Sequence, residues 1–171
     1  PKQKEAWSGE NEKEGLITLF QELLTYKDFN LIHHNGRSFD LPVIEYRALR
    51  FNLQMPPRLS HREIKYRFSG NNIDLVDEFT NYGASSWPKL KHLGMLINIP
   101  FKQVSEGNLV YEQYLLSNFN IIENYCYEDV VATYIIWLHL EYTRSNIKEK
   151  EFENLKSRAL NKLFDIQKTN K

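Results

Sequence analysis

The stretch from Asn108 to Arg144 restricts the fold more than any other feature, because it contains neither glycine nor proline. Within it, side chains that suit a protein interior recur every three or four residues, which is the spacing of one face of an α-helix. These positions are Phe119, Ile122, Cys126, Val130, Thr133, Trp137 and Leu140. We therefore predict a long helix in this part of the chain.

Shorter elements of both kinds are predicted before this helix. Helical spacing over residues 12–26 is followed by a β-leaning segment at 29–34, which ends at an Asn-Gly turn. Asp40 can then cap a helix over residues 41–49, with Pro42 in its first turn, where the missing N–H costs nothing. This order of helix, strand, loop and helix favours an α/β fold.

The remaining segments are less regular. Residues 64–68 alternate like a half-buried or edge strand, and residues 73–77 form a second apolar run. Residues 86–93 indicate a short helix that has Pro88 in its first turn and ends near Gly94. We expect one domain over residues 1–147, followed by a charged and solvated helical tail over 148–171.

Composition excludes several classes of protein. The 171 residues carry 22 basic and 22 acidic side chains, which argues against a histone-like polycation but leaves local charge open. No apolar run is long enough to span a membrane, and the first residues lack the apolar segment of a signal peptide. Cys126 is the only cysteine, so a disulfide framework and a cysteine-rich zinc site are excluded. A cytoplasmic location is the expectation.

Asp40 is the first candidate for chemistry. It follows the Asn35-Gly36 loop just beyond a predicted strand end, and ligands of open α/β sheets bind outside the carboxyl ends of strands. The alternative is that Asp40 serves only as a helix cap.

Tyr125 and Asp129 form the second candidate. They are four residues apart in the long predicted helix, so they share a face. The carboxylate could hold a divalent cation while the phenol points at the same reacting group. The alternative is a tyrosine that covers the helix surface beside a solvated acid.

Residues 47–67 contain six basic side chains and one acidic side chain, Glu63. The basic ones are Arg47, Arg50, Arg58, Arg62, Lys65 and Arg67. Such a stretch could follow a phosphate backbone, with Tyr66 and Phe68 stacked on bases. A solvated basic surface explains it equally well.

These features also occur in a characteristic order. The blocks are HNGRSFDLPV at 34–43 with EYRAL at 45–49, IDLVD at 73–77 with NYGA at 81–84, residues 90–100, and YCYEDV at 125–130 with Thr133-Tyr134. The whole run from Ser8 to Ile147 resembles the predicted 3′-5′ exonucleases related to the proofreading domain of family B DNA polymerases. A tyrosine four residues before Asp129 marks the DEDDy group of this ribonuclease H-like superfamily.

The resemblance implies a ribonuclease H-like mixed sheet flanked by helices, and hydrolysis of nucleic acid from a single-stranded 3′ end, with DNA as the expected substrate. Four carboxylates would hold two Mg²⁺ or Mn²⁺ ions, with Asp129 on one and Asp40 on the other. Tyr125 would orient the attacking water. Asn35 would fix the loop, and Asp74 would first of all cap the next helix and support the site. The side chains expected to contact nucleic acid are Arg37, Arg58, Arg62, Lys65 and Arg67.

One expected motif is missing. The family carries Asp-x-Glu on its opening strand, and this sequence contains no Asp-x-Glu. We therefore expect that the N-terminal strands, about 20–50 residues, are absent. The 171 residues present are then expected to be inactive by themselves. A second fragment could supply the strands. The alternative is a non-catalytic ribonuclease H-like module that binds nucleic acid or a protein.

Overall fold

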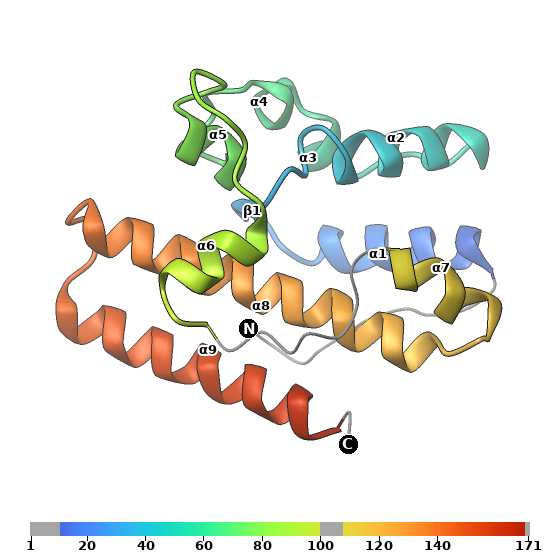
Figure 1. The fold of residues 1–171 in the computed structure, drawn as a ribbon. Coiled ribbons are helices and arrows are strands. Elements are labelled where there is room, and N and C mark those ends of the chain that lie inside the picture. Colours follow the sequence, from blue (N-terminus) through green and yellow to red (C-terminus); the bar gives the residue numbers. More distant parts are fainter. Residues whose placement is uncertain (1–10, 100–107, 170–171) are drawn as a thin grey trace. The chain divides into compact units, whose positions relative to one another are not determined.

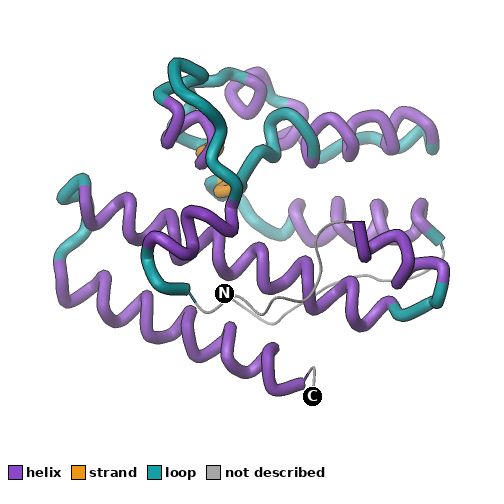
Figure 2. The backbone as a smooth tube through the Cα atoms, in the orientation of Figure 1, coloured by secondary structure: helices purple, strands orange, loops and turns teal. Residues whose placement is uncertain are grey.

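The computed structural model describes residues 11–99 and 108–169. Helices make up most of them, and strand occurs only in short segments (Figure 2). The chain divides between Trp87 and Pro88 into two compact units, which we describe one at a time. This division falls inside the domain expected over residues 1–147. Ser8 and Pro100, at the ends of two segments used for the family resemblance, lie outside the described residues.

The first unit begins with the predicted order of helix, strand and helix. Helix α1 spans Glu12–Leu24, strand β1 spans Leu31–His33, and helix α2 spans Asp40–Arg50. The residue that caps α2 is Phe39 and not Asp40, so the expectation that Asp40 caps this helix is wrong. Asp40 is instead the first helical residue and is exposed, which leaves its carboxylate accessible.

Strand β2 spans Asn72–Asp74 and pairs in parallel with β1, so that His33 lies opposite Asp74. Helix α5, Leu75–Thr80, follows directly. The prediction of a strand over residues 64–68 is wrong: helix α4, Arg62–Lys65, occupies its start after the short helix α3, Pro57–Ser60. Ile64 is buried, but the apolar side chains that alternate with it, Tyr66 and Phe68, are each 58% exposed and have no partner strand among the described residues.

The core of this unit joins α1, α2 and α3. Phe20, Ala48 and Leu59 are buried together, one from each helix. Partly buried apolar side chains complete the cluster: Leu16, Leu23, Phe29, Leu31, Leu41, Ile44, Leu53 and Met55. The core therefore fixes β1 and α2, and with them both ends of the loop that contains Asn35.

The second unit is helical in its described part. Helix α6 spans Leu90–Leu96, α7 spans Asn108–Leu115, α8 spans Phe119–Thr143 and α9 spans Glu149–Thr169 (Figure 1). Helix α6 begins after Pro88 and continues through a buried Gly94, so both predicted ends of this helix are wrong by a few residues. The long predicted helix is interrupted at Ser117, which has a left-handed backbone with φ 57°.

Helix α8 buries the predicted face only in part: Thr133 is buried, but two other predicted positions are exposed. Val130 is 58% exposed and Cys126 is exposed, whereas Val131, Ile135 and Leu138 are buried. Apolar side chains occur on nearly every side of α8 from Val130 to Leu138, so spacing alone does not identify the inner face.

Helix α9 turns back along α8 (Figure 1). It is a helix, as the charged tail predicts, but it is not solvated on all sides. Phe152, Ala159 and Leu163 are buried at positions that share one face, and the ring of Phe152 stacks on that of Tyr142 at 4.5 Å between centroids. The packing makes α9 part of the same unit as α8.

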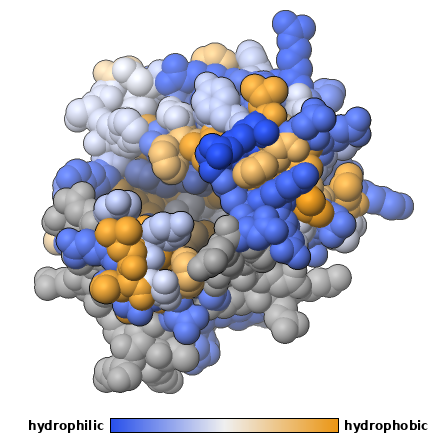
Figure 3. Space-filling model, turned by 90° about the vertical axis from the view of Figure 1, so that its right-hand side faces the viewer, coloured by the Kyte–Doolittle hydropathy of each residue, from blue (hydrophilic) through white to orange (hydrophobic). Residues whose placement is uncertain are grey.

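The described residues thus form a mostly helical α/β structure with a two-stranded parallel sheet. The larger mixed sheet expected from the resemblance stays a prediction. No helix within 11–99 or 108–169 has the length and apolar character needed to cross a bilayer. The face in Figure 3 carries hydrophobic residues at several separate places among hydrophilic ones.

Candidate functional site

The loop from His34 to Phe39 carries the chain from β1 to Asp40. Asn35 adopts a left-handed backbone with φ 67°, a conformation that asparagine tolerates better than most residues. Its carbonyl oxygen accepts hydrogen bonds from the backbone N–H groups of Ser38 and Phe39, each at 3.1 Å. The loop is therefore a tight turn that leads directly into the first turn of α2.

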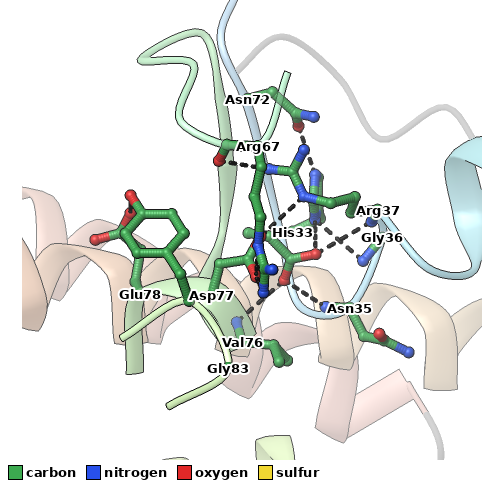
Figure 4. A network of polar contacts seen from close by, with 12 residues as sticks. His33, Asn35, Gly36, Arg37, Arg67, Asn72, Val76, Asp77, Glu78 and Gly83 are labelled. Atoms are coloured by element: carbon green, nitrogen blue, oxygen red, sulfur yellow. Dashed lines mark hydrogen bonds and ion pairs between the residues drawn. The ribbon is translucent and has the colours of Figure 1, made fainter. Parts of the chain in front are cut away.

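Asp74, at the end of β2, fixes this loop through hydrogen bonds to its backbone. Its side chain is 3% exposed. Oδ1 accepts from the backbone N–H of Asn35 at 2.8 Å and of Val76 at 3.0 Å, and Oδ2 accepts from the N–H of Arg37 at 3.1 Å (Figure 4). Asp74 thus caps α5, as predicted, and also fixes two residues of the loop. Both of its oxygens are engaged within the protein, so we assign it a supporting role.

The environment of Asp74 keeps its carboxylate ionised. Burial opposes ionisation, but the side chain of His33 and the backbone N–H groups of Asn35 and Arg37 outweigh burial. Together they lower the pKa of Asp74 from 3.8 to about 2. The loop is therefore held by a charged group over the whole physiological pH range.

His33 links the two strands at the same point. Its Nε2 lies 2.6 Å from Oδ1 of Asn72, a residue that is 1% exposed. Its Nδ1 lies 3.1 Å from the backbone nitrogen of Gly36 and 3.4 Å from Oδ2 of Asp74. The N–H of Gly36 donates to this nitrogen, so His33 also contacts the loop that follows β1.

Asp77, on α5, is a second buried carboxylate under the loop. Arg37 Nε donates to Oδ2 at 2.8 Å, and Arg67 donates to Oδ1 from Nε at 3.0 Å and from a terminal nitrogen at 2.7 Å. The two guanidinium groups converge on Asp77 from different segments (Figure 4). Arg37 also donates to the backbone carbonyl of Arg67 at 3.1 Å. Both arginines expected to contact nucleic acid here are held by an ion pair with Asp77.

The other three predicted cations lie in different environments. Arg58 is partly buried against the ring of Phe29 and donates to that residue's carbonyl oxygen at 3.3 Å. Lys65 pairs with Glu45 at 2.7 Å at the surface. Arg62 is exposed. The basic stretch is thus divided among several structural roles, and Arg62 remains at the surface.

Tyr125 and Asp129, on α8, lie on the same helix face as their spacing predicts. Burial raises the pKa of the Tyr125 phenol to about 12, and the charge of Asp129 and a hydrogen bond between the two side chains add to this effect. The phenol is therefore protonated at neutral pH and donates to the carboxylate. Asp129 itself is partly exposed.

These donors suit a hard divalent cation, because carboxylate oxygens are the ligands that Mg²⁺ and Mn²⁺ prefer. Within the described residues, no group of three or more histidine, cysteine, aspartate or glutamate side chains could hold a metal ion. Asp40 and Asp129 each offer one carboxylate, in separate units. Carboxylates are thus the right kind of ligand for such a cation, but these are two where the resemblance implies four.

Sequence reasoning missed His33, Asn72 and Asp77. The sequence patterns give no role to His33 or Asn72, and they contain Asp77 only as part of the IDLVD segment. The spacing of Asp74 and Asp77, three residues apart across the start of a helix, places both carboxylates under the preceding loop. That spacing is visible in the sequence, but the partners are not: Asn35 and Arg37 come from 37 to 40 positions earlier, and Arg67 from 10 positions before Asp77.

Comparison with known proteins gives one match. Residues 5–171 match the family described as predicted 3′-5′ exonuclease related to the exonuclease domain of PolB. No curated protein and no solved structure matches the chain.

Proposed function

This chain belongs to the family of predicted 3′-5′ exonucleases related to the exonuclease domain of PolB, and we propose that it acts as a metal-dependent exonuclease domain on the 3′ end of single-stranded nucleic acid, with DNA as the expected substrate. The observation that carries the proposal is the pairing of Tyr125 with Asp129 inside a family match that covers nearly the whole chain. A tyrosine and an aspartate four residues apart on a helix do not by themselves identify reacting groups. A family match does not identify them by itself either.

Asp40 and Asp129 are the proposed metal ligands. Asp40 is exposed at the start of α2, where the helix dipole favours a negative charge, and the loop before it is fixed by Asp74. Two divalent cations, when bound, supply an activated water and stabilise the oxygen that leaves the phosphate. Asp74 and Asn35 keep the Asp40 loop in one conformation, so that little reorganisation is needed when a ligand binds.

Tyr125 orients the attacking water as a hydrogen-bond donor. With a pKa of about 12, its phenol keeps its proton throughout the range in which enzymes normally work. It therefore cannot serve as the base that removes a proton from water at neutral pH. Its hydrogen bond to Asp129 also fixes the direction in which the phenol points.

The missing Asp-x-Glu sets the expected activity of these 171 residues by themselves. The family mechanism uses four carboxylates, and this sequence supplies Asp40 and Asp129 for that purpose. Two carboxylates neutralise only half of the charge of two dications, so binding is weak and hydrolysis is close to the background rate. A second fragment that contributes the missing acids and the remaining strands of a ribonuclease H-like sheet would restore activity.

A cleavage assay tests the proposal. Single-stranded DNA labelled at its 5′ end is incubated with Mn²⁺ and the protein, and the products are separated by length. We expect at most slow, stepwise shortening from the 3′ end, which requires Mn²⁺ and disappears in Asp129→Ala. An Asp28→Ala variant, in which an exposed acid of the first unit is removed, serves as the matched control.

Two results would contradict parts of this proposal. Rapid shortening that depends on Asp129 would support the exonuclease and refute the expected inactivity. DNA or protein binding without any effect of Mn²⁺ or of Asp129→Ala would favour the non-catalytic module, for which the missing Asp-x-Glu is the specific observation.

A further inference from the structure

Three aromatic rings form a contiguous surface cluster in the first unit, which we call the aromatic platform: Tyr66, Phe68 and Tyr82. The ring of Phe68 lies 5.7 Å from that of Tyr66 and 4.5 Å from that of Tyr82, measured between centroids. The interplanar angles are 67° and 49°, so neither pair is stacked face to face. Tyr66 and Phe68 are each 58% exposed. Their ring surfaces therefore remain in contact with solvent, and contiguous exposed apolar groups of this kind often mark an interaction site.

The turn that presents Tyr82 has an unusual backbone. Asn81, Tyr82 and Gly83 have φ values of 50°, 58° and 95°, so three successive residues are left-handed. Such a conformation is costly for a tyrosine and needs support from its surroundings. The N–H of Tyr82 donates to the carbonyl of Asp77 at 2.8 Å, and the N–H of Gly83 donates to Oγ1 of Thr80 at 2.9 Å. The fold thus holds the Tyr82 ring in place against Phe68.

A guanidinium group lies beside these rings. Arg67, between the other two platform residues in sequence, has its Cζ atom 5.9 Å from the centroid of Tyr82. Its side chain is 46% exposed, while its partner Asp77 is only 9% exposed. The negative charge is therefore buried beneath the positive one, and the cation faces the solvent. Arg62, at the start of α4, is a second exposed cation and lies four residues before Tyr66 in sequence.

The platform is also coupled to the candidate catalytic loop. Asp77 binds Arg67 on one oxygen and Arg37 on the other, and Arg37 belongs to the loop that leads to Asp40. The backbone of Arg37 is fixed by Asp74 at 3.1 Å. A ligand held by the platform and by Arg67 would therefore be held close to the loop before Asp40.

We infer that the aromatic platform binds the bases of single-stranded nucleic acid by stacking, while Arg67 and Arg62 contact its phosphates. This inference rests on the proposed function and adds to it a binding surface for the strand. Every base has a flat aromatic face, so stacking on exposed rings is independent of sequence, and neighbouring cations follow the phosphate backbone. Arg67, which Asp77 holds beside the three rings, brings both requirements together at one surface.

The test compares two strands that differ only in their bases. Binding is measured by fluorescence anisotropy in EDTA, first with an oligothymidylate of about 12 nucleotides and then with an abasic strand of the same length. Phe68→Ala should weaken binding of the oligothymidylate about tenfold or more and change binding of the abasic strand less than about twofold. Phe68→Trp keeps a flat ring and should bind as wild type does.

A matched control uses an exposed aromatic residue outside the platform. Tyr46 on α2 is 67% exposed, and Tyr46→Ala should leave binding of both strands unchanged. The inference is overturned if Phe68→Ala binds the oligothymidylate like wild type, or if wild type binds both strands equally. Preferential capture of a proline-rich peptide by the platform would also overturn it. Because EDTA excludes metal chemistry, this result is separate from the cleavage assay, whose failure would count against the proposed function alone.

Discussion

Replacing Asp74 with asparagine should destabilise the protein in a pH-dependent way. The substitution keeps the shape of the side chain but removes its charge and one acceptor oxygen. With Oδ1 retained, Asn35 and Val76 keep their partner, while the partly buried N–H of Arg37 faces an amide group that cannot accept. Asparagine at this position therefore resembles a permanently protonated aspartic acid.

The size of the effect follows from the pKa of Asp74. A decrease from 3.8 to about 2 corresponds to about 2.4 kcal/mol of stability at neutral pH. Because the pKa is lowered in the folded state, this contribution is complete well above pH 3.8 and is lost as the pH falls towards 2 and below. At a pH of about 3, roughly half of it remains. We expect Asp74→Asn to cost about 2–3 kcal/mol at pH 7 and about half as much near pH 3.

The assay is urea unfolding followed by circular dichroism at a series of pH values. Asp28→Asn, at an exposed position of the same unit, is the control and should change stability by less than about 0.5 kcal/mol at every pH. A cost of Asp74→Asn below about 0.5 kcal/mol at pH 7 would refute the reasoning, because such a cost is typical of surface positions. A cost that does not change between pH 7 and pH 3 would show that charge is not the cause.

Three further predictions concern the second unit. Asp129→Asn should lower the pKa of Tyr125 from about 12 towards its ordinary value of about 10, measured by NMR of ring-labelled tyrosine; an unchanged pKa would show that Asp129 does not contribute to it. Leu163→Ala, at a fully buried position of α9, should cost about 2–5 kcal/mol in urea unfolding, whereas Phe164→Ala, at a residue 44% exposed, should cost much less; equal costs would contradict the buried face of α9. Ser145→Gly should raise stability by about 0.5–1 kcal/mol, because Ser145 follows α8 with φ 61°; a lower melting temperature would argue against relief of backbone strain.

Local patterns predicted the elements that local forces control. The apolar spacing of α1 and the Asn-Gly turn before α2 are decided within a few residues, and both elements occur near the predicted positions. The spacing of Tyr125 and Asp129 also needs only the geometry of one helix. Each of these predictions depends on contacts between near neighbours in sequence.

The predictions of secondary structure and burial were wrong where contacts between residues distant in sequence determine the structure. Ile64 is buried, and its backbone carbonyl accepts a hydrogen bond from the side-chain amide of Asn72, eight residues later. Its alternation with Tyr66 and Phe68 therefore reflects one anchored residue and not a strand. The interruption at Ser117 has no glycine or proline to announce it. The inner face of α8 is chosen by the helices that pack on it, and its own apolar residues do not specify which side is covered.

The candidate site shows the same division. The position of Asp40 after a strand and a loop made it a candidate from the sequence. Its exposure could not be predicted, because a different residue occupies the cap position. The role of Asp77 depends on two arginines, 40 positions before it and 10 positions before it in sequence. Only the folded structure brings these three side chains together.

The central claim is that Asp129, paired with Tyr125, is a ligand of a divalent cation. A titration with Mn²⁺ followed by NMR tests it, because this paramagnetic ion broadens the signals of nearby nuclei. We expect the amide signal of residue 129 to broaden as Mn²⁺ is added, Asp129→Asn to abolish this broadening, and Asp28→Asn, at an exposed acid, to leave it unchanged. Broadening that persists unchanged in Asp129→Asn, or none at residue 129 in the wild type, would contradict the account.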